Sequence, residues 1–343
     1  MNRSSVSTHI RVMAMVLLPA IAGAAFAQER VDGAIQNRGF FQQKIAPEEI
    51  GVHHDSEFKG AKKVAISVFN VAFPRENHYT AITEGNSFWA RMGSSAKAYM
   101  DTEMTGLDQE TRQRIADKAF ALFVEQLKGA GYDVVEQAEL IKLAPEYAKW
   151  DVLPNYSQGR FGTYVAPTGR GLYFLQGDSA KRDTSGTFGG FREFRALDRP
   201  QAFSRSPYIA NAGNIGIIAV TLVVDYGVYS SSGQSRNLGG GASVGYKPGV
   251  TIAAGNISDS ATLLEYWGPN SGGFPALAFL QQPIRSEKPF AMITGMEAQT
   301  EKSEGAAVRD IKLVADPLKF EAAADEVLAI ALPKLVSVMK AAQ

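Results

Sequence analysis

The first candidate for covalent chemistry is a serine flanked by glycines. Gly241–Gly245 matches G-x-S-x-G, the pattern that places the serine nucleophile of many hydrolases on a turn between a strand and a helix. In this chain a glycine-rich stretch precedes Ser243, Pro248 and a β-like run follow it, and no histidine occurs after His78. The surroundings therefore favour a glycine-rich hairpin, and we assign no hydrolase site.

A second candidate is the serine–lysine pair of penicillin-interacting enzymes. Ser94–Lys97 and Ser56–Lys59 both match S-x-x-K. Lys247–Gly249 and Ser258–Ser260 resemble the partner motifs of those enzymes only in part, and they come in a different order. A motif that occurs twice in one chain arises easily by chance, so the sequence indicates no catalytic residue.

Histidine and glycine clusters give little support for a bound metal or cofactor. His53–Asp55 lies near Glu48 and Glu49, but adjacent side chains diverge in an extended segment and seldom share one ion. Gly239–Gly241 lacks the Lys-Ser/Thr pair of a phosphate-binding loop. We therefore predict neither a metal site nor a cofactor.

The segment Asp151–Ala212 differs from the rest of the chain because it is rich in glycine, arginine and aromatic residues. Aromatic side chains and arginine are favoured at the centres of protein interfaces, so this segment is a candidate interaction region. Two alternatives stay open: the aromatic residues fill a core beneath long loops, or they line a pocket for a small or lipidic ligand. The candidate interaction residues are Tyr156, Phe161, Arg170, Tyr173, Phe188, Phe191, Arg192 and Phe194.

The elements that must position these residues begin with a strand. Val64–Val71 is rich in β-branched residues, and both of its faces are apolar, which suits a strand covered on both sides. Arg75–Gly106 reads as a loop with a short helix over Phe88–Met100. A helix follows, capped by Asp108 or Thr111; its apolar residues at helical spacing are Ile115, Ala119, Leu122, Phe123 and Leu127.

The pattern then repeats. Tyr132–Val135 predicts a second strand and Gln137–Leu143 a short helix. Ile215–Val228 is the most apolar run of the chain, and its near-continuous Ile, Val and Leu place it at the centre of a sheet. Ala242–Tyr246 and Val250–Ala254 read as a hairpin, and Phe290–Met296 as a further strand.

The chain ends in a predicted helix. Asp316 is its N-cap and Pro317 its first residue, and Pro333 is expected to kink it. Together these elements predict an α/β fold with a mixed central sheet flanked by helices, a Gly- and aromatic-rich β or loop insertion, and a C-terminal helix. The predicted divisions are a signal peptide at 1–27, an extended arm at 28–61, an α/β half at 62–150, the insertion at 151–212, and the remaining sheet and helix at 213–343.

The amino-terminal residues predict the compartment. Arg3 and Arg11 precede the apolar run Val12–Ala22, and Ala25–Ala27 is a small-x-small cleavage signal. This is the layout of a secretory signal peptide, cleaved after Ala27. The chain has no cysteine and a formal net charge of zero. It therefore offers no disulfide or thiol nucleophile and no electrostatic footprint for nucleic acid, and it suits a bacterial periplasm.

One stretch of the chain resembles known families. The residues KKVAISVFNVAFPRENHY at 62–79 and RIADKAFALFVEQLKGAGYDVVEQAELIKL at 114–143 resemble the amino-terminal α/β domain of TolB-like proteins and of CsgG-type curli secretion components. Ile215–Val228 matches a later strand of the same sheet. The chain departs from the CsgG type because it lacks the cysteine that carries the lipid anchor.

The resemblance implies a non-catalytic envelope protein that works by association. It would act as an oligomeric assembly or secretion accessory component at the outer membrane, either as a homo-oligomer or with an envelope protein partner. Peripheral association with the outer membrane fits this reading, whereas a nucleic-acid partner does not. The alternative is a soluble periplasmic protein that binds a small or lipidic ligand, and an unrecognised hydrolase is a third reading.

Overall fold

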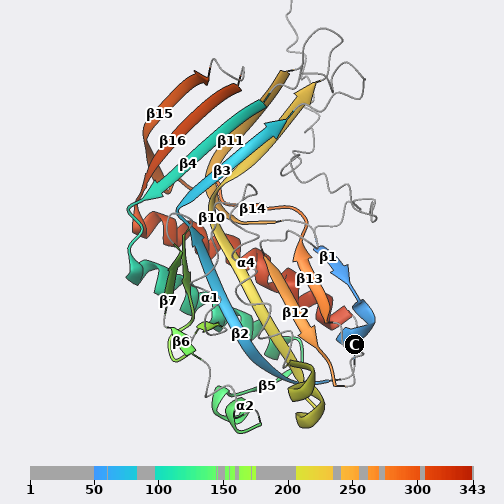
Figure 1. The fold of residues 1–343 in the computed structure, drawn as a ribbon. Coiled ribbons are helices and arrows are strands. Elements are labelled where there is room, and N and C mark those ends of the chain that lie inside the picture. Colours follow the sequence, from blue (N-terminus) through green and yellow to red (C-terminus); the bar gives the residue numbers. More distant parts are fainter. Residues whose placement is uncertain are drawn as a thin grey trace, which may run out of the picture.

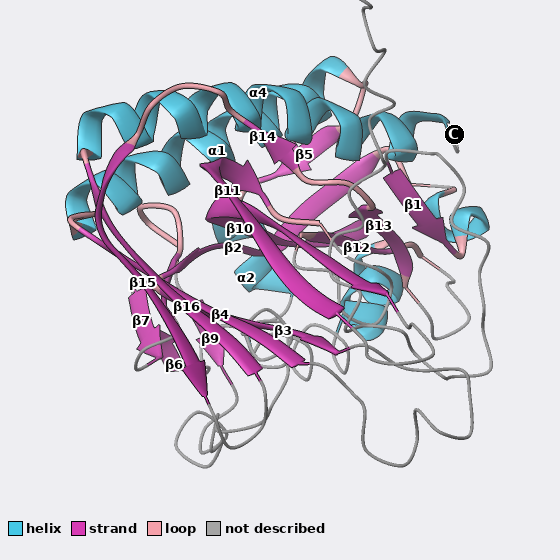
Figure 2. Cartoon of the chain, turned by 90° about the horizontal axis from the view of Figure 1, so that it is seen from above, coloured by secondary structure: helices cyan, strands magenta, loops and turns pink. Residues whose placement is uncertain are grey.

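The computed structural model describes residues 50–59, 61–82, 97–143, 145, 151–153, 155–158, 162–170, 172–174, 206–234, 241–254, 262–269, 275–301 and 306–341. Its strands form a large sheet of ten strands, a small sheet of four and a separate pair. Helices α1 (Gln109–Gly129) and α4 (Pro317–Ala341) lie together over one face of the large sheet (Figure 2). The architecture confirms the predicted α/β fold with a mixed sheet and a C-terminal helix.

The large sheet is built around strand β10 (Gly216–Gln234), which pairs in parallel with β2 (Lys63–Pro74) and antiparallel with β12 (Leu263–Trp267). The other strands are β1 (Ile50–His53), β5 (Asp133–Val135), β7 (Asn155–Gln158), β8 (Gly162–Val165), β11 (Gly241–Ile252), β13 (Ala276–Leu280) and β14 (Ile284–Arg285). Both faces of β2 and of the first part of β10 are buried, which explains their unbroken apolar sequences. The central place predicted for Ile215–Val228 is confirmed.

The helices begin where the sequence predicts. Asp108 caps α1 by accepting a hydrogen bond from the backbone N–H of Thr111 at 2.7 Å. Asp316 accepts a bond from the backbone N–H of Lys319 at 3.3 Å, at the start of α4. Pro333 lies inside α4, which continues to Ala341. The remaining helical elements are α2 (Gln137–Leu143), the 3-10 turn η1 (Asp55–Phe58) and residues 206–213.

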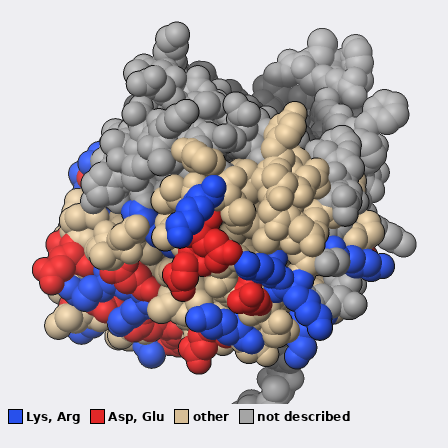
Figure 3. All heavy atoms as spheres, turned by 90° about the horizontal axis from the view of Figure 1, so that it is seen from below, with Lys and Arg blue, Asp and Glu red and all other residues tan. Residues whose placement is uncertain are grey.

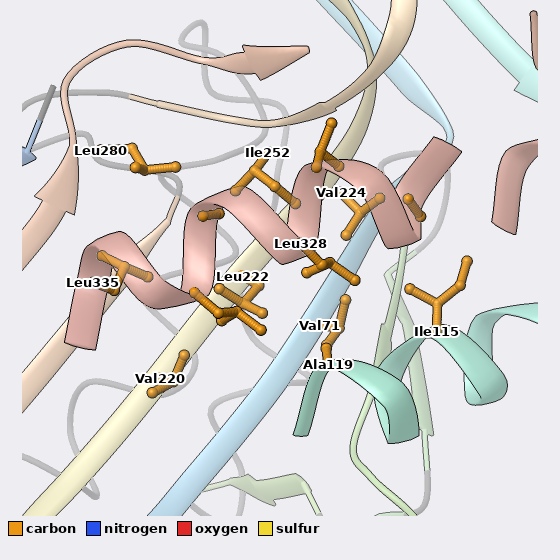
Figure 4. Close-up of a cluster of buried hydrophobic side chains, with 14 of the residues drawn as sticks. Val71, Ile115, Ala119, Val220, Leu222, Val224, Ile252, Leu280, Leu328 and Leu335 are labelled. Atoms are coloured by element: carbon orange, nitrogen blue, oxygen red, sulfur yellow. The ribbon is translucent and has the colours of Figure 1, made fainter. Parts of the chain in front are cut away.

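The main core lies between the helices and the large sheet. Val71 on β2, Leu222 on β10, Ile115 on α1 and Leu328 on α4 are all buried in it (Figure 4). Each buried side chain of this kind stabilises the fold by about 1.5–3 kcal/mol. Among the described helices, none combines the length and apolar character that a membrane span requires.

The small sheet has the strand order β15 (Ala291–Glu301), β16 (Ala306–Ala315), β4 (Lys97–Thr105) and β3 (Glu76–Ile82). Together with the β10–β11 hairpin it rises from the body of the molecule at the end opposite α2 (Figure 1). The separate pair joins β6 (Asp151–Leu153) to β9 (Leu172–Phe174).

Two sequence predictions are wrong. The first is the loop over Arg75–Gly106, because its described residues form the strands β3 and β4; most of the short helix predicted over Phe88–Met100 lies outside the described residues. The second is the hairpin of Ala242–Tyr246 and Val250–Ala254, because both segments belong to a single run paired with β10. Pro248 lies beside the register shift between the two strands, where β11 carries an extra residue and tolerates the missing N–H.

Candidate functional site: a polar junction and an open sheet edge

The small sheet contacts the β10–β11 hairpin through buried polar side chains. This junction cluster consists of Asn77 on β3, Thr102 on β4, and Asp225, Tyr226 and Tyr229 on β10. The side-chain amide of Asn77 donates to Asp225 Oδ1 at 2.9 Å and lies 3.1 Å from the Tyr229 hydroxyl, to which it also donates. One amide therefore links β3 to two side chains of β10.

Thr102 extends the junction cluster to β4. Its hydroxyl forms hydrogen bonds with the hydroxyls of Tyr229, at 2.6 Å, and of Tyr226, at 3.0 Å. The Tyr226 hydroxyl also lies 2.9 Å from the carbonyl oxygen of Thr102 and 3.1 Å from that of Arg75, which are acceptors for its proton. These bonds fix how the small sheet lies against the hairpin.

A register shift and a glycine bring Tyr246 of β11 close to β10, beside the junction cluster. The register of β10 against β11 shifts between Asp225 and Gly227. A Cβ at Gly227 would collide with the ring of Tyr246, so only glycine allows this close approach. The Tyr246 hydroxyl donates to the carbonyl oxygen of Tyr226 at 2.9 Å and so ties β11 to β10 at the register shift.

Burial controls the electrostatics of the junction cluster. Asp225 is 1 % exposed, and burial raises its pKa to about 7, although hydrogen bonds from the Tyr226 N–H and from Asn77 oppose the shift. Burial also raises the pKa values of Tyr226 and Tyr229 well above the usual range. Among the described ion pairs, none includes Asp225. The acid thus lies in a neutral, tyrosine-lined environment.

The opposite side of the small sheet ends in the edge strand β15. Met292, Ile293 and Met296 on this strand are 69 %, 49 % and 66 % exposed. Val314, the neighbour of Met292 on β16, is also exposed. Within the described strands β15 pairs only with β16. An edge strand with large apolar side chains is a surface on which another strand can pair, and soluble proteins usually protect such edges.

Arg170 is the only predicted interaction residue whose side chain is among those that the structure describes. The Arg170 guanidinium donates to the carbonyl oxygen of Ile66 at 2.8 Å and lies 4.3 Å from the ring centroid of Phe120. It therefore packs against β2 and α1, away from the junction cluster. Tyr156 lies in β7 and Tyr173 in β9. Phe161, Phe188, Phe191, Arg192 and Phe194 lie outside the described residues.

Of the residues considered for chemistry, Ser94, Ser258–Ser260, Glu48 and Glu49 lie outside the described residues. Ser243 lies within strand β11, opposite Ser232 of β10, and not on a turn between a strand and a helix. His53 ends β1 and His54 precedes the turn η1. No group of three or more metal-ligand residues exists among the described residues.

The junction cluster and the β15 edge were both missed in the sequence, since no motif marks them. One signal was available: Asp225 is the only charged residue in the apolar run Ile215–Val228. On the face shown in Figure 3, Lys and Arg side chains are interspersed with Asp and Glu, so neither sign of charge dominates there. Comparisons of the chain with protein-family models, with curated proteins and with solved structures give no match.

Proposed function

We propose that this chain is a non-catalytic, exported envelope protein that acts as an oligomeric assembly or secretion accessory component at the outer membrane. The observation that carries the proposal is strand β15, an edge with exposed Met292, Ile293 and Met296. An edge of this kind invites association unless a partner strand covers it. The resemblance of Lys62–Leu143 to TolB-like and CsgG-type domains supports an envelope role.

The partner that we propose for β15 is a second copy of the chain. Among the described strands, the small sheet ends in β15 on one side and in β3 on the other, so one chain supplies two different edges. Contact between unlike surfaces of identical chains builds rings or filaments, depending on whether the rotation closes. Pairing through β15 would also cover the apolar side chains that a single chain leaves exposed.

Sedimentation velocity of the chain without residues 1–27 tests this proposal. We expect a mass of several subunits for the wild type and a monomer for the double variant Met292→Lys/Met296→Lys, because lysine on an edge strand opposes pairing. Ile330→Lys is the matched control: Ile330 is 42 % exposed in the middle of α4, away from the start of that helix, which adjoins β15, and its variant should keep the wild-type mass. A wild type that is monomeric at every concentration would contradict the proposal.

A second function, binding of a small ligand, is favoured by Asn70. This residue is completely buried on β2, and neither atom of its side-chain amide has a hydrogen-bond partner among the described residues. Because side chains alternate along a strand, Asn70 lies on the face opposite Phe69, which contacts α1. Thr221 is its neighbour on β10. Buried amides normally have partners, so a ligand with donor and acceptor groups would suit this position.

Native mass spectrometry of protein purified from cells tests the second function. A retained small molecule that is lost in Asn70→Leu would support it. Protein that is empty in every preparation would count against it.

A further inference from the structure

We propose that Asp225 is a proton-controlled latch: its protonated form holds the small sheet against the β10–β11 hairpin, and loss of the proton releases the small sheet. The latch concerns contacts within a single chain, so it does not depend on the proposed function. It adds control by pH over the contact between the small sheet and the β10–β11 hairpin.

The geometry makes Asp225 the link between the two parts. It lies at the register shift between β10 and β11, and its Oδ1 accepts hydrogen bonds from the Asn77 side chain at 2.9 Å and from the Tyr226 N–H at 2.7 Å. Asn77 belongs to β3, so the first of these bonds crosses from the large sheet to the small one. The second bond fixes the carboxyl group to the backbone of its own strand. A change at this carboxyl group therefore acts directly on the contact between the sheets.

The surroundings favour the neutral acid. Among the described residues, the polar groups that interact with Asp225 are the amide of Asn77 on β3 and three tyrosines: Tyr226 and Tyr229 on its own strand and Tyr246 on β11. All three tyrosines have pKa values raised by burial, so they stay neutral while Asp225 titrates. Two hydrogen bonds from neutral donors compensate only in part for the loss of water around a buried carboxylate.

Further contacts between the small sheet and β10 would also separate when Asp225 loses its proton. Tyr79 on β3 stacks on Tyr229, and Thr102 on β4 bonds to the hydroxyls of Tyr226 and Tyr229. An ionised Asp225 is stabilised by contact with water, and separation of these contacts would admit water to it. Release would expose β3 and β4, the strands of the small sheet that face the hairpin.

Hydrogen–deuterium exchange of β3 and β4 at pH 5 and pH 8 tests the latch, with rates corrected for the intrinsic effect of pH. Burial raises the pKa of Asp225 to about 7, so opening of these strands in the wild type should increase about a hundredfold between the two conditions. Asp225→Asn keeps the size and the acceptor oxygen but carries no charge, and its opening should be independent of pH. Glu125→Gln, which removes an exposed acid on α1, should behave as the wild type.

The same pH dependence in the wild type and in Asp225→Asn would overturn the latch. If Asp225→Asn does not fold, carbon-detected NMR titration of the Asp225 carboxyl in the wild type decides the question. A pKa near neutrality supports the latch, and a pKa below about 5 overturns it.

Discussion

Tyr79 on β3 stacks on Tyr229 on β10, with ring centroids 3.3 Å apart and planes inclined by 17°. The two residues are far apart in sequence, yet they place the small sheet directly on the long central strand. The Tyr229 hydroxyl completes this contact through its bonds to Asn77 and Thr102. The stack and these bonds therefore hold the small sheet, and with it the edge strand β15, against β10.

Removal of the Tyr229 hydroxyl tests the junction cluster. Tyr229→Phe keeps the stack on Tyr79 but loses the bonds to Asn77 and Thr102, so we expect the free energy of unfolding to fall by about 1–2 kcal/mol. Urea denaturation measures this change. Tyr208→Phe, at a residue that is 69 % exposed, is the control and should change stability very little. Equal effects of the two variants would show that the hydroxyl does not contribute.

The register shift between β10 and β11 gives a second prediction. Gly227→Ala would place a Cβ against the ring of Tyr246 and weaken its bond to the Tyr226 carbonyl, so we expect a loss of about 1–3 kcal/mol. Gly295→Ala on β15 is the matched control, because its nearest contact would lie 3.6 Å away, on Lys312. Thermal unfolding should separate the two variants clearly. A Gly227→Ala protein as stable as Gly295→Ala would contradict the close approach at the register shift.

The contact between the long helices gives a third prediction. Glu321 on α4 accepts hydrogen bonds from Arg114 at 2.9 Å and from Lys118 at 2.7 Å, both on α1. Glu321→Gln should lower the free energy of unfolding by about 1–3 kcal/mol, since bonds between charged groups are replaced by weaker ones. Glu110 is the exposed ion-pair partner of Arg114, so Glu110→Gln should change the free energy of unfolding by no more than about 0.5 kcal/mol. Urea denaturation at neutral pH compares them, and equal losses would argue against a special role for Glu321.

The pH dependence of stability should show two separate windows. Burial tends to raise the pKa of Glu321, but the bonds from Arg114 and Lys118 outweigh it and hold that pKa below its usual value. The contribution of Glu321 is therefore present above its unfolded-state pKa and is lost as the pH falls through the folded-state pKa.

The pKa of Asp225 shifts in the opposite direction to that of Glu321. Its pKa rises from 3.8 in the unfolded chain to about 7 in the fold, so the folded state binds more protons between these values. Stability from Asp225 is therefore full below about pH 4 and falls as the pH rises to about 7, by a few kcal/mol in total. Denaturation midpoints measured from pH 4 to pH 8 should decline in the wild type. In Asp225→Asn this decline should be largely absent, and an unchanged decline would contradict the assignment.

The sequence predicted the elements whose apolar pattern is complete within one segment. β2, α1, α2, β10 and α4 all carry either a continuous apolar run or a clear helical period. β3 and β4 were missed because their polar residues, such as Asn77 and Thr102, suggested a loop. Those polar residues are buried only because β10 supplies their partners from a distant part of the chain. β15 was recognised as a strand, but its position at an edge depends on strand order, which no local pattern encodes.

The most direct test of the central claim is methionine footprinting of β15. Met292 and Met296 are exposed in a single chain, whereas Met100 and Met339 are buried and serve as internal controls. In the assembled protein of intact cells we predict that peroxide oxidises Met292 and Met296 as slowly as the buried methionines. Dilution to monomer should make both react rapidly. Rapid oxidation of Met292 and Met296 in cells, at the rate of the diluted chain, would contradict assembly through β15.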